Sequence, residues 1–278
     1  MHSSETLGFV YAAKGAKYID LALNSARSLK DSNPGATVHL YCDSHPAERH
    51  CFDAVHILSE SQSKRPKFEA LRRAEFDRTI YLDADTFVCA DISDIFFTLD
   101  RFDIAGAHVV LRNSRHSHRT HKIRFPNSFP QINTGVLAIR KSQRMSDFLA
   151  QVDAEMAAAD SVVDQPIFRE LLWHSDLRIA VLPPEYNFKR INEVVTMSSA
   201  YCAPRIIHDS DLRRPDGKAA NDATTLEGFL RRGAYRHLIA LLSADKFLSP
   251  GSQKKVSPLA RVPRAKRQGK LRKLLGLG

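Results

Sequence analysis

Segments typical of β-strands and of α-helices alternate along most of this 278-residue chain. Between Tyr18 and Leu29, for example, apolar residues stand at helical spacing, and turn-forming residues follow at 32–35. This order is expected of βαβ units with a largely parallel sheet, so we expect an α/β fold. The predicted strands are 7–12, 37–42, 79–82, 104–110, 132–139, 179–182 and 205–208, and the predicted helices are 18–29, 68–76, 92–99, 142–159, 164–173 and 226–242.

The positive charge of the chain is concentrated at one end. The formal net charge is +10, from 41 basic and 31 acidic residues. Nine of the basic residues and no acid lie in 251–278, which leaves 32 basic against 31 acidic side chains in 1–250. We therefore predict a folded domain over 1–250 and a basic C-terminal tail over 251–278. A nearly neutral body, with no aromatic residues interleaved in the tail, argues against nucleic acid as a partner.

Cysteine usage and hydropathy bear on the compartment. The four cysteines have neither C-x-x-C spacing nor the density of a disulfide scaffold, which favours a reducing environment. The first residues lack a basic n-region, and the apolar stretch 7–13 is too short for a signal peptide. No stretch approaches about 18 uninterrupted apolar residues. We expect a cytoplasmic protein without a spanning helix.

Two acids stand at the end of the predicted strand 79–82. Asp83 and Asp85 are spaced i, i+2, which points both side chains to one side if the extended backbone continues. Two like charges at a strand end are unfavourable unless a cation or water separates them. At the carboxyl edge of an open α/β sheet, a hard divalent ion held by this pair can bridge a diphosphate. The pair alone is equally compatible with an exposed acidic turn.

A phosphatase-like D-x-D-x-[TV] motif would instead make Asp83 a nucleophile that becomes phosphorylated. Here the fourth position after Asp83 is Phe87 rather than Thr or Val. The later paired acids that such an enzyme uses for magnesium are also not evident. The pattern therefore favours the metal and diphosphate interpretation over the phosphatase one.

Over roughly residues 7–215 the sequence resembles the family 8 glycosyltransferases, the group of glycogenin and bacterial lipopolysaccharide galactosyltransferases. The resemblance depends on the order and spacing of several short motifs. They are Phe9-Val10 with Tyr18 nine residues after Phe9, Lys67 sixteen residues before Asp83, Asp83 with Asp85, Ile132 to Val136, Asp164-Gln165, Leu182-Pro183 with Tyr186-Asn187, and His208.

This resemblance implies a GT-A fold, a Rossmann-like open mixed sheet flanked by helices, with 1–250 as the catalytic domain. It implies metal-dependent, retaining transfer of a hexose from a nucleotide-diphosphate sugar, expected to be a UDP-sugar, to a glycan or lipid-linked saccharide acceptor. The implied ligands of Mn²⁺ or Mg²⁺ are Asp83, Asp85 and His208. The implied catalytic residues are Asp164, Gln165 and Asn133. The implied donor-binding residues are Val10, Tyr11, Ala12, Tyr18, Lys67, Asp83, Ala84, Asp85, Asn133, Gly135, Asp211 and Arg214.

The last motif departs from the family pattern H-x-x-G-x-x-K-P. Here it reads His208, Asp211, Arg214 and Pro215, so an aspartate replaces the glycine and an arginine the lysine. An aspartate beside a diphosphate is electrostatically unfavourable. The alternative function is therefore a noncatalytic nucleotide-sugar-binding or scaffold protein with the same fold.

Single residues of the motifs also have structural interpretations. His208 can be a histidine that ends a strand, and Asn133 can be a turn residue. Asp164 can cap a helix, and Lys67 can be a solvated surface charge. The sequence alone does not decide between these structural roles and the functional ones.

Two basic segments complete the pattern. The loop 112–127 carries His116, His118 and His121 among five cations and no acid, which disfavours a metal cluster. It can face a phosphorylated or acidic acceptor, or be a solvated loop. In the tail, leucines stand among the cations, which predicts peripheral attachment to an anionic membrane surface at the inner face; a disordered solubilising tail is the alternative.

Overall fold

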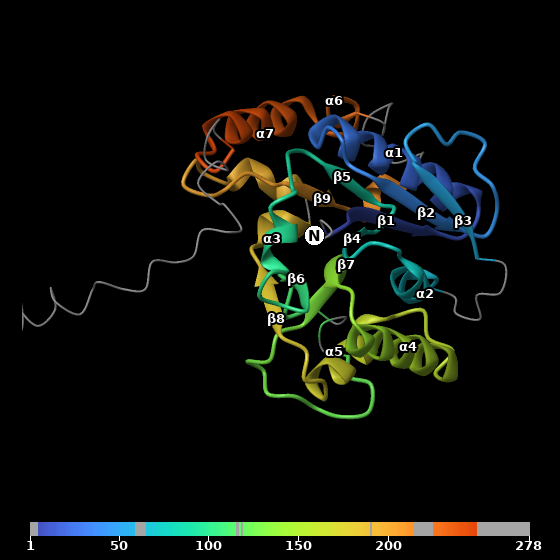
Figure 1. Cartoon of the computed structure of the whole chain (residues 1–278). Helices are drawn as coiled ribbons and strands as arrows, with labels where there is room; N and C mark the ends of the chain where they lie inside the picture. Colours follow the sequence, from blue (N-terminus) through green and yellow to red (C-terminus); the bar gives the residue numbers. More distant parts are fainter. Residues whose placement is uncertain are drawn as a thin grey trace, which may run out of the picture.

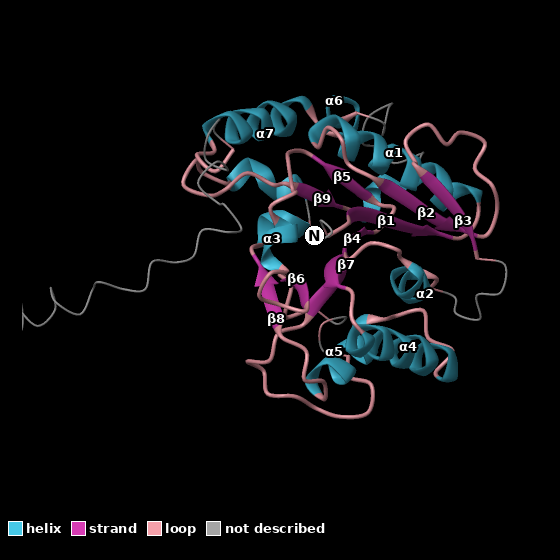
Figure 2. Cartoon of the chain, viewed as in Figure 1, coloured by secondary structure: helices cyan, strands magenta, loops and turns pink. Residues whose placement is uncertain are grey.

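The computed structural model describes residues 5–58, 65–114, 117, 119–189, 191–213 and 225–248. A seven-stranded sheet lies between two layers of helices, with α1, α6 and α7 on one side and α2, α4 and α5 on the other (Figures 1 and 2). The strands of this sheet are β1 (Leu7–Ala13), β2 (Val38–Cys42), β3 (Ala54–Ile57), β4 (Arg78–Leu82), β6 (Ile104–His108), β7 (Ile132–Arg140) and β8 (Ile179–Leu182). The helices are α1 (Ala16–Ser32), α2 (Lys67–Arg73), α3 (Ile95–Thr98), α4 (Gln143–Ala158), α5 (Gln165–Trp173), α6 (Leu226–Phe229) and α7 (Arg232–Ala244).

The sheet order is β3-β2-β1-β4-β7-β6-β8. Strand β7 runs antiparallel to both of its neighbours, whereas the remaining pairs are parallel. The reversal follows from the connection between β6 and β7, which is a loop rather than a crossover helix. The expected open mixed α/β sheet flanked by helices is thus confirmed.

A small second sheet pairs β5 (Thr86–Val88) with β9 (Ile206–His208) in antiparallel register. Strand β5 packs against α1, so the second sheet lies on the α1 side of the main sheet. Three 3-10 helices, η1 (Pro184–Asn187), η2 (Ile191–Thr196) and η3 (Ser210–Arg213), flank β9 in the chain. The second sheet therefore joins the segment after β4 to a segment more than a hundred residues later.

Strand β1 lies in the middle of the sheet, and both of its faces are covered. Val10 and Tyr11 are each 0% exposed. Tyr11 shares a hydrogen bond of 2.9 Å between its hydroxyl and that of Ser25, and Val10 packs in the same core cluster as Phe68. These two side chains belong to the hydrophobic core, and the assignment of the two residues to donor binding stays a prediction.

Several predicted elements differ in detail. The sequence predicted neither β3 nor β5, and the predicted helix 226–242 is two helices. Leu230 and Arg231 interrupt it with extended backbone, and Leu230 is buried beside Phe229. The predicted helix 92–99 is regular only over Ile95–Thr98. The predicted cap of α4 is confirmed, because the Ser142 hydroxyl accepts a hydrogen bond from the Met145 amide at 3.1 Å.

A buried ion pair joins the segment that follows α7 to the rest of the domain. Arg205 donates to Asp245 at 2.8 Å, and the same carboxylate oxygen accepts from the Ala203 amide at 2.7 Å. The predicted tail 251–278 lies outside the described residues. Within the described part of the chain, none of the helices combines the length and apolar character needed to cross a bilayer.

Candidate active site

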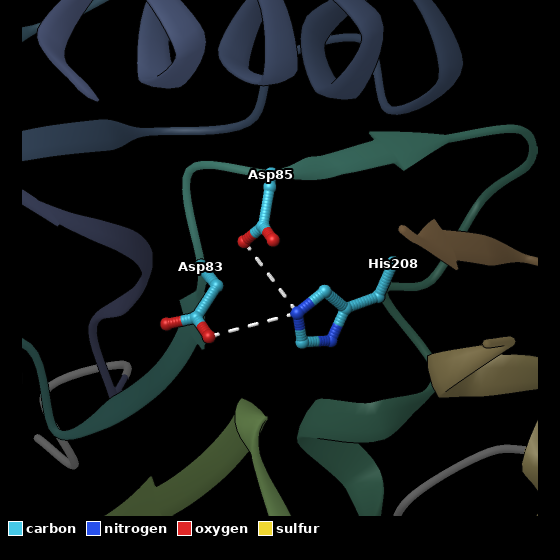
Figure 3. Close-up of side chains that lie close together, drawn as sticks. All are labelled: Asp83, Asp85 and His208. Carbon is cyan, nitrogen blue, oxygen red and sulfur yellow. Dashed lines mark ion pairs between the residues drawn. The ribbon is translucent and has the colours of Figure 1, made fainter. Parts of the chain in front are cut away.

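The paired strands β5 and β9 bring together residues that are distant in sequence. Thr86 is the register partner of His208, so the histidine lies opposite the D-x-D turn. The Nε2 atom of His208 is 3.5 Å from Asp85 Oδ1 and 3.7 Å from Asp83 Oδ2 (Figure 3). One potential ligand atom from each residue lies within 4.8 Å of the other two. Tertiary structure thus places all three predicted metal ligands around one point.

A hydrogen bond to Asn187 fixes the orientation of the His208 imidazole. Asn187 donates from Nδ2 to the Asn133 carbonyl at 3.4 Å, so its Oδ1 faces His208. His208 Nδ1 lies 2.9 Å from this oxygen and therefore donates to it. In the neutral ring this leaves the Nε2 lone pair facing the two carboxylates. Such a lone pair facing two anions is unfavourable unless a cation lies between them.

Gly135 provides the space in which these side chains meet. A Cβ added at this position would lie 2.0 Å from His208 Cε1 and 2.9 Å from Asp83 Oδ2. The backbone of Gly135 also accepts a hydrogen bond from the Asp83 amide at 2.8 Å. The glycine of the Asn-Thr-Gly-Val segment is therefore required by close packing against the acid–histidine cluster.

We expect Gly135→Ala to lower the affinity for Mn²⁺ by about 10- to 100-fold, because the new methyl group must displace His208. Calorimetric titration of the metal in the presence of UDP measures this loss. Gly233→Ala in α7 is the matched control, since its added Cβ meets no atom within 4 Å. Unchanged metal affinity in Gly135→Ala would contradict the assignment of His208 as a ligand.

The donor set fits a divalent cation of the Mn²⁺ or Mg²⁺ type. Two carboxylate oxygens and one imidazole nitrogen leave the other octahedral positions for phosphate oxygens and water. Adjacent ligands of such an ion are roughly 3 Å apart, given metal–oxygen distances of about 2.1 Å. The separations of 3.5 and 3.7 Å need only a small contraction to reach this geometry.

Lys67, at the start of α2, connects the acid pair to the segment before α5. Its ammonium lies 3.1 Å from Asp83 Oδ1 and 3.0 Å from Asp164 Oδ2. It also donates to the carbonyl of Thr134 at 2.9 Å. The side chain is 4% exposed, which excludes a solvated surface charge. Lys67 therefore holds Asp83 and Asp164 in fixed positions.

The charges in this network stabilise one another. Burial lowers the pKa of Lys67, but attraction to Asp164 and Asp83 outweighs it, so the pKa is raised above its usual value. Burial raises the pKa of Asp164, but Lys67 and the Thr134 hydroxyl outweigh it and the pKa is lowered. The Thr134 hydroxyl donates to Asp164 at 2.8 Å. The lysine is held as a cation and Asp164 as an anion.

Tyr81 adds a second contact to Asp83. Its hydroxyl donates to Asp83 Oδ1 at 2.8 Å, and its ring lies 5.2 Å from the Lys67 ammonium. Burial and the neighbouring Asp83 carboxylate raise the pKa of Tyr81 well above its usual value, so the tyrosine is a neutral donor. The sequence predicted no role for Tyr81 or Thr134, although Thr134 lies within the motif 132–136 and Tyr81 is two residues before Asp83.

A cavity of about 320 Å³ opens beside these groups. Six of the predicted donor-binding residues line it, whereas Val10 and Tyr11 do not. The lining residues are Ala12, Ala13, Lys14, Tyr18, Arg65, Pro66, Lys67, Tyr81, Asp83, Ala84, Asp85 and Val162. Lys14 and Arg65 give this cavity two further cations that the motif comparison did not predict.

The remaining predicted residues lie on the β7 and α5 side of the site. Asn133 is buried, and its Oδ1 accepts from the Gly135 amide at 3.0 Å, so its side chain shapes the strand beside the cluster. Asp164 precedes α5 without capping it, since its carboxylate binds Lys67. Gln165 Oε1 accepts from Gln131 Nε2 at 3.3 Å.

Asp211 lies in η3, three residues after His208. Its amide donates to Asp209 Oδ1 at 3.0 Å, and its side chain is half-buried. Arg214 lies outside the described residues, so the structure places only the first part of the divergent H-x-x-D motif.

The basic loop is partly described. His121 and Lys122 contact Glu155 at 3.3 and 2.8 Å, so these two groups are paired with an acid. His116 and His118 lie outside the described residues. Among the residues that are described, the group of three or more potential metal ligands is Asp83, Asp85 and His208.

Residues 78–211 match the family described as nucleotide-diphospho-sugar transferase. This segment begins with β4 and ends three residues after His208, and it contains both acids of the D-x-D pair. No curated protein matches the chain significantly.

Solved structures share the fold. The galactosyltransferase LgtC in complex with donor and acceptor sugar analogues is 13% identical, with a TM-score of 0.54 over 89% of this chain and 99% of that one. The glycosyltransferase GlyE of Streptococcus pneumoniae is 19% identical, with a TM-score of 0.56 over 86% of this chain and 62% of its own. The bifunctional glycosyltransferase WbbM is 11% identical, with a TM-score of 0.55 over 89% and 51%.

At these identities the solved structures establish the fold, and the family match over residues 78–211 supports the reaction class. The GT-A architecture expected from the motifs is confirmed, as is the resemblance to family 8. The chain is a glycosyltransferase with a GT-A fold, and its residues 78–211 are similar to the nucleotide-diphospho-sugar transferase family.

Proposed function

We propose that this enzyme is a metal-dependent, retaining hexosyltransferase that uses a UDP-sugar and a glycan or lipid-linked saccharide acceptor. The observation that carries the proposal is the convergence of Asp83, Asp85 and His208 on one point beside a cavity. The family described as nucleotide-diphospho-sugar transferase supports a diphosphate donor, because such a donor brings two anionic phosphates to the site.

The three ligand side chains would hold Mn²⁺ or Mg²⁺. The chemistry that a divalent cation supplies there is neutralisation of the charge on the departing nucleoside diphosphate. Lys14 and Arg65, which line the cavity, add positive potential for the same phosphates. Lys67 contributes by fixing Asp83, since its ammonium is already engaged by two carboxylates.

The residues proposed to act on the donor sugar lie at the start of α5. Asp164 is held by Lys67 and Thr134 through Oδ2, and it orients the donor sugar. Gln165, the next residue, would lie near the anomeric carbon of that sugar. Retention of configuration is expected if the acceptor attacks on the face from which the diphosphate leaves.

Thermal unfolding with UDP and Mn²⁺ tests the metal and donor site. Ligand at one hundred times its Kd stabilises by about 2.7 kcal/mol, which corresponds to a rise in Tm of roughly 5–10 °C for a domain of this size. UDP without metal should shift Tm less, and EDTA should reverse the increase. GDP and ADP are the controls for base selectivity. If no nucleoside diphosphate gives a metal-dependent shift, the proposed site is wrong.

Turnover separates the enzyme from a noncatalytic nucleotide-sugar binder. With UDP-glucose and UDP-galactose in turn, we expect metal-dependent release of UDP. Metal-dependent binding of the donor without hydrolysis or transfer to any saccharide tested would instead support the scaffold alternative, with Asp211 as the departure to examine first.

We further propose a cytoplasmic location with peripheral attachment through residues 251–278, which lie outside the described residues. The nine cations of this segment support it, because each contributes about 1 kcal/mol near an anionic surface. The full chain should cosediment with phosphatidylserine vesicles more strongly than a chain ending at residue 250. Equal cosedimentation of the two would contradict the proposal.

A further inference from the structure

Helix α5 begins at the site and runs away from it, and one of its faces carries three side chains of interest. Gln165, Arg169 and Trp173 are spaced i, i+4 and i+8, so they lie along the same side of the helix. The first of them follows Asp164, which is tied through Lys67 to Asp83. A molecule that reaches Gln165 can therefore also contact the two residues farther along this face.

An aromatic platform covers the far end of this face. The Trp173 ring lies 4.8 Å from the ring of Phe129 and 5.8 Å from that of Phe125, in edge-to-face arrangements. Trp173 nevertheless remains 43% exposed. An exposed tryptophan held by two other rings presents a rigid apolar surface at low entropic cost, which suits the apolar face of a sugar ring.

Arg169 supplies positive charge within the platform. Its guanidinium lies 5.2 Å from the Phe125 ring and 5.8 Å from the Phe129 ring, and it donates to the Phe129 carbonyl. The Nε atom is buried and has no hydrogen-bond partner in the part of the chain that the structure describes. A buried donor of this kind calls for a ligand or a solvent partner.

A second arginine reinforces this charge. Burial lowers the pKa of Arg169, and the positive charge of the neighbouring Arg112 lowers it further. Arg112 is exposed and donates to the Asn127 carbonyl. Across the described residues, neither arginine forms an ion pair with a carboxylate, in contrast to His121 and Lys122 on the same loop.

The loop that carries Phe125 is fastened to α5. The buried Glu170 carboxylate accepts from the amides of Lys122 and Ile123 at 2.7 and 3.2 Å. The platform and the two arginines are therefore held in place by a contact that does not use either guanidinium. This anchoring favours a built binding surface over a solvated loop.

We propose that this face of α5 binds the acceptor and that the acceptor is an anionic saccharide. A sugar ring packs on Trp173 and Phe129, and a phosphate or carboxylate of the same saccharide pairs with Arg169 and Arg112. The assignment rests on the proposed glycosyl transfer at the neighbouring site, and it names the acceptor class that this transfer uses. The carboxylates near the loop have other partners. Glu155 pairs with Lys122, and Glu170 accepts from the Lys122 amide, so neither neutralises these arginines.

Tryptophan fluorescence tests the surface directly, because Trp173 is the only tryptophan in the chain. The full-length protein is titrated with a phosphorylated core oligosaccharide, with the same oligosaccharide after phosphatase treatment, with a uronic-acid trisaccharide and with inorganic phosphate. We expect the phosphorylated or the uronic-acid saccharide to bind about tenfold more tightly than the neutral one, as for one charge-assisted contact. If the phosphorylated saccharide binds more tightly than the uronic-acid one, the recognised anion is a phosphate; the reverse order identifies a carboxylate.

Variants separate the charge from the fold. Arg169→Met keeps an apolar stem and should reduce the preference for the anionic saccharide to less than about twofold, whereas Arg169→Lys should retain part of it. Arg112→Gln, at an exposed position, should weaken binding of the anionic saccharide and leave the stability of the fold unchanged. Arg236→Gln, an exposed arginine on α7, is the matched control and should change nothing.

Three results would overturn the assignment. They are equal binding of the neutral and both anionic saccharides, no change of Trp173 fluorescence with any saccharide, and an unchanged anion preference in both Arg169→Met and Arg112→Gln. The metal-dependent shift of Tm with UDP is measured in parallel. If that shift is present while the anion preference is absent, the acceptor assignment fails alone; if the shift is absent, the proposed function fails.

Discussion

Asp85→Asn is expected to lower the rate of sugar transfer by about a thousandfold. The substitution keeps the shape of a buried side chain and removes a carboxylate 3.5 Å from His208 Nε2. A metal that neutralises the leaving diphosphate supplies several kcal/mol of transition-state stabilisation, and a loss of about 4 kcal/mol corresponds to this factor. Transfer from the UDP-sugar at saturating Mn²⁺ is the measurement.

The fold and the metal site respond differently to this change. Removal of one of two neighbouring negative charges should leave the Tm of the metal-free protein unchanged or slightly higher. The rise in Tm on addition of Mn²⁺ and UDP should largely disappear. Asp31→Asn, an exposed acid on α1, is the matched control and should transfer at the wild-type rate. Transfer within about tenfold of wild type in Asp85→Asn would refute a metal-dependent mechanism at this site.

Lys67→Met is expected to destabilise the protein by about 3–5 kcal/mol. The variant leaves Asp83 and Asp164 without the cation that each contacts at about 3 Å, and Asp164 is buried. Removal of one partner from a buried ion pair has this cost because the remaining charge stays desolvated. Urea unfolding in the absence of metal and nucleotide gives the free energy directly.

Two further variants test this explanation. In Lys67→Met with Asp164→Asn, part of the lost stability should return, because one uncompensated charge is removed with the lysine. Lys30→Met breaks a pair with Asp53 at 2.8 Å whose side chains are 31% and 44% exposed, and it should cost no more than about 1 kcal/mol. Equal losses in Lys67→Met and Lys30→Met would show that the Lys67 network does not carry the predicted stability.

The order of elements was predictable because hydrophobic period and turn residues are local signals. Helix α1 buries Ile19, Ala22 and Leu29 at the predicted spacing, and Ser142 caps α4 as predicted. Strands β3 and β5 were missed because they are only four and three residues long. Their pairing depends on neighbours that a short apolar pattern does not reveal.

Side-chain access was harder to predict. Val10 and Tyr11 stand on the strand that leads into the cavity, yet both are buried because β1 is central and covered on two faces. Lys67 lines the cavity as predicted for a donor-binding residue, but its ion pairs with Asp83 and Asp164 were not predicted. Burial and partner choice arise from packing between distant segments, which the spacing within a motif does not encode.

The residues by themselves determined the α/β class, the position of the acid pair at a strand end and the family resemblance, since all three depend on neighbours in the chain. Tertiary structure decided the rest. The antiparallel pairing of Thr86 with His208 brings an imidazole to two carboxylates, and Gly135 leaves the space for it. The fold also packs Trp173 against Phe125 and Phe129. Such contacts between remote segments form only when the sheet and its covering helices pack together.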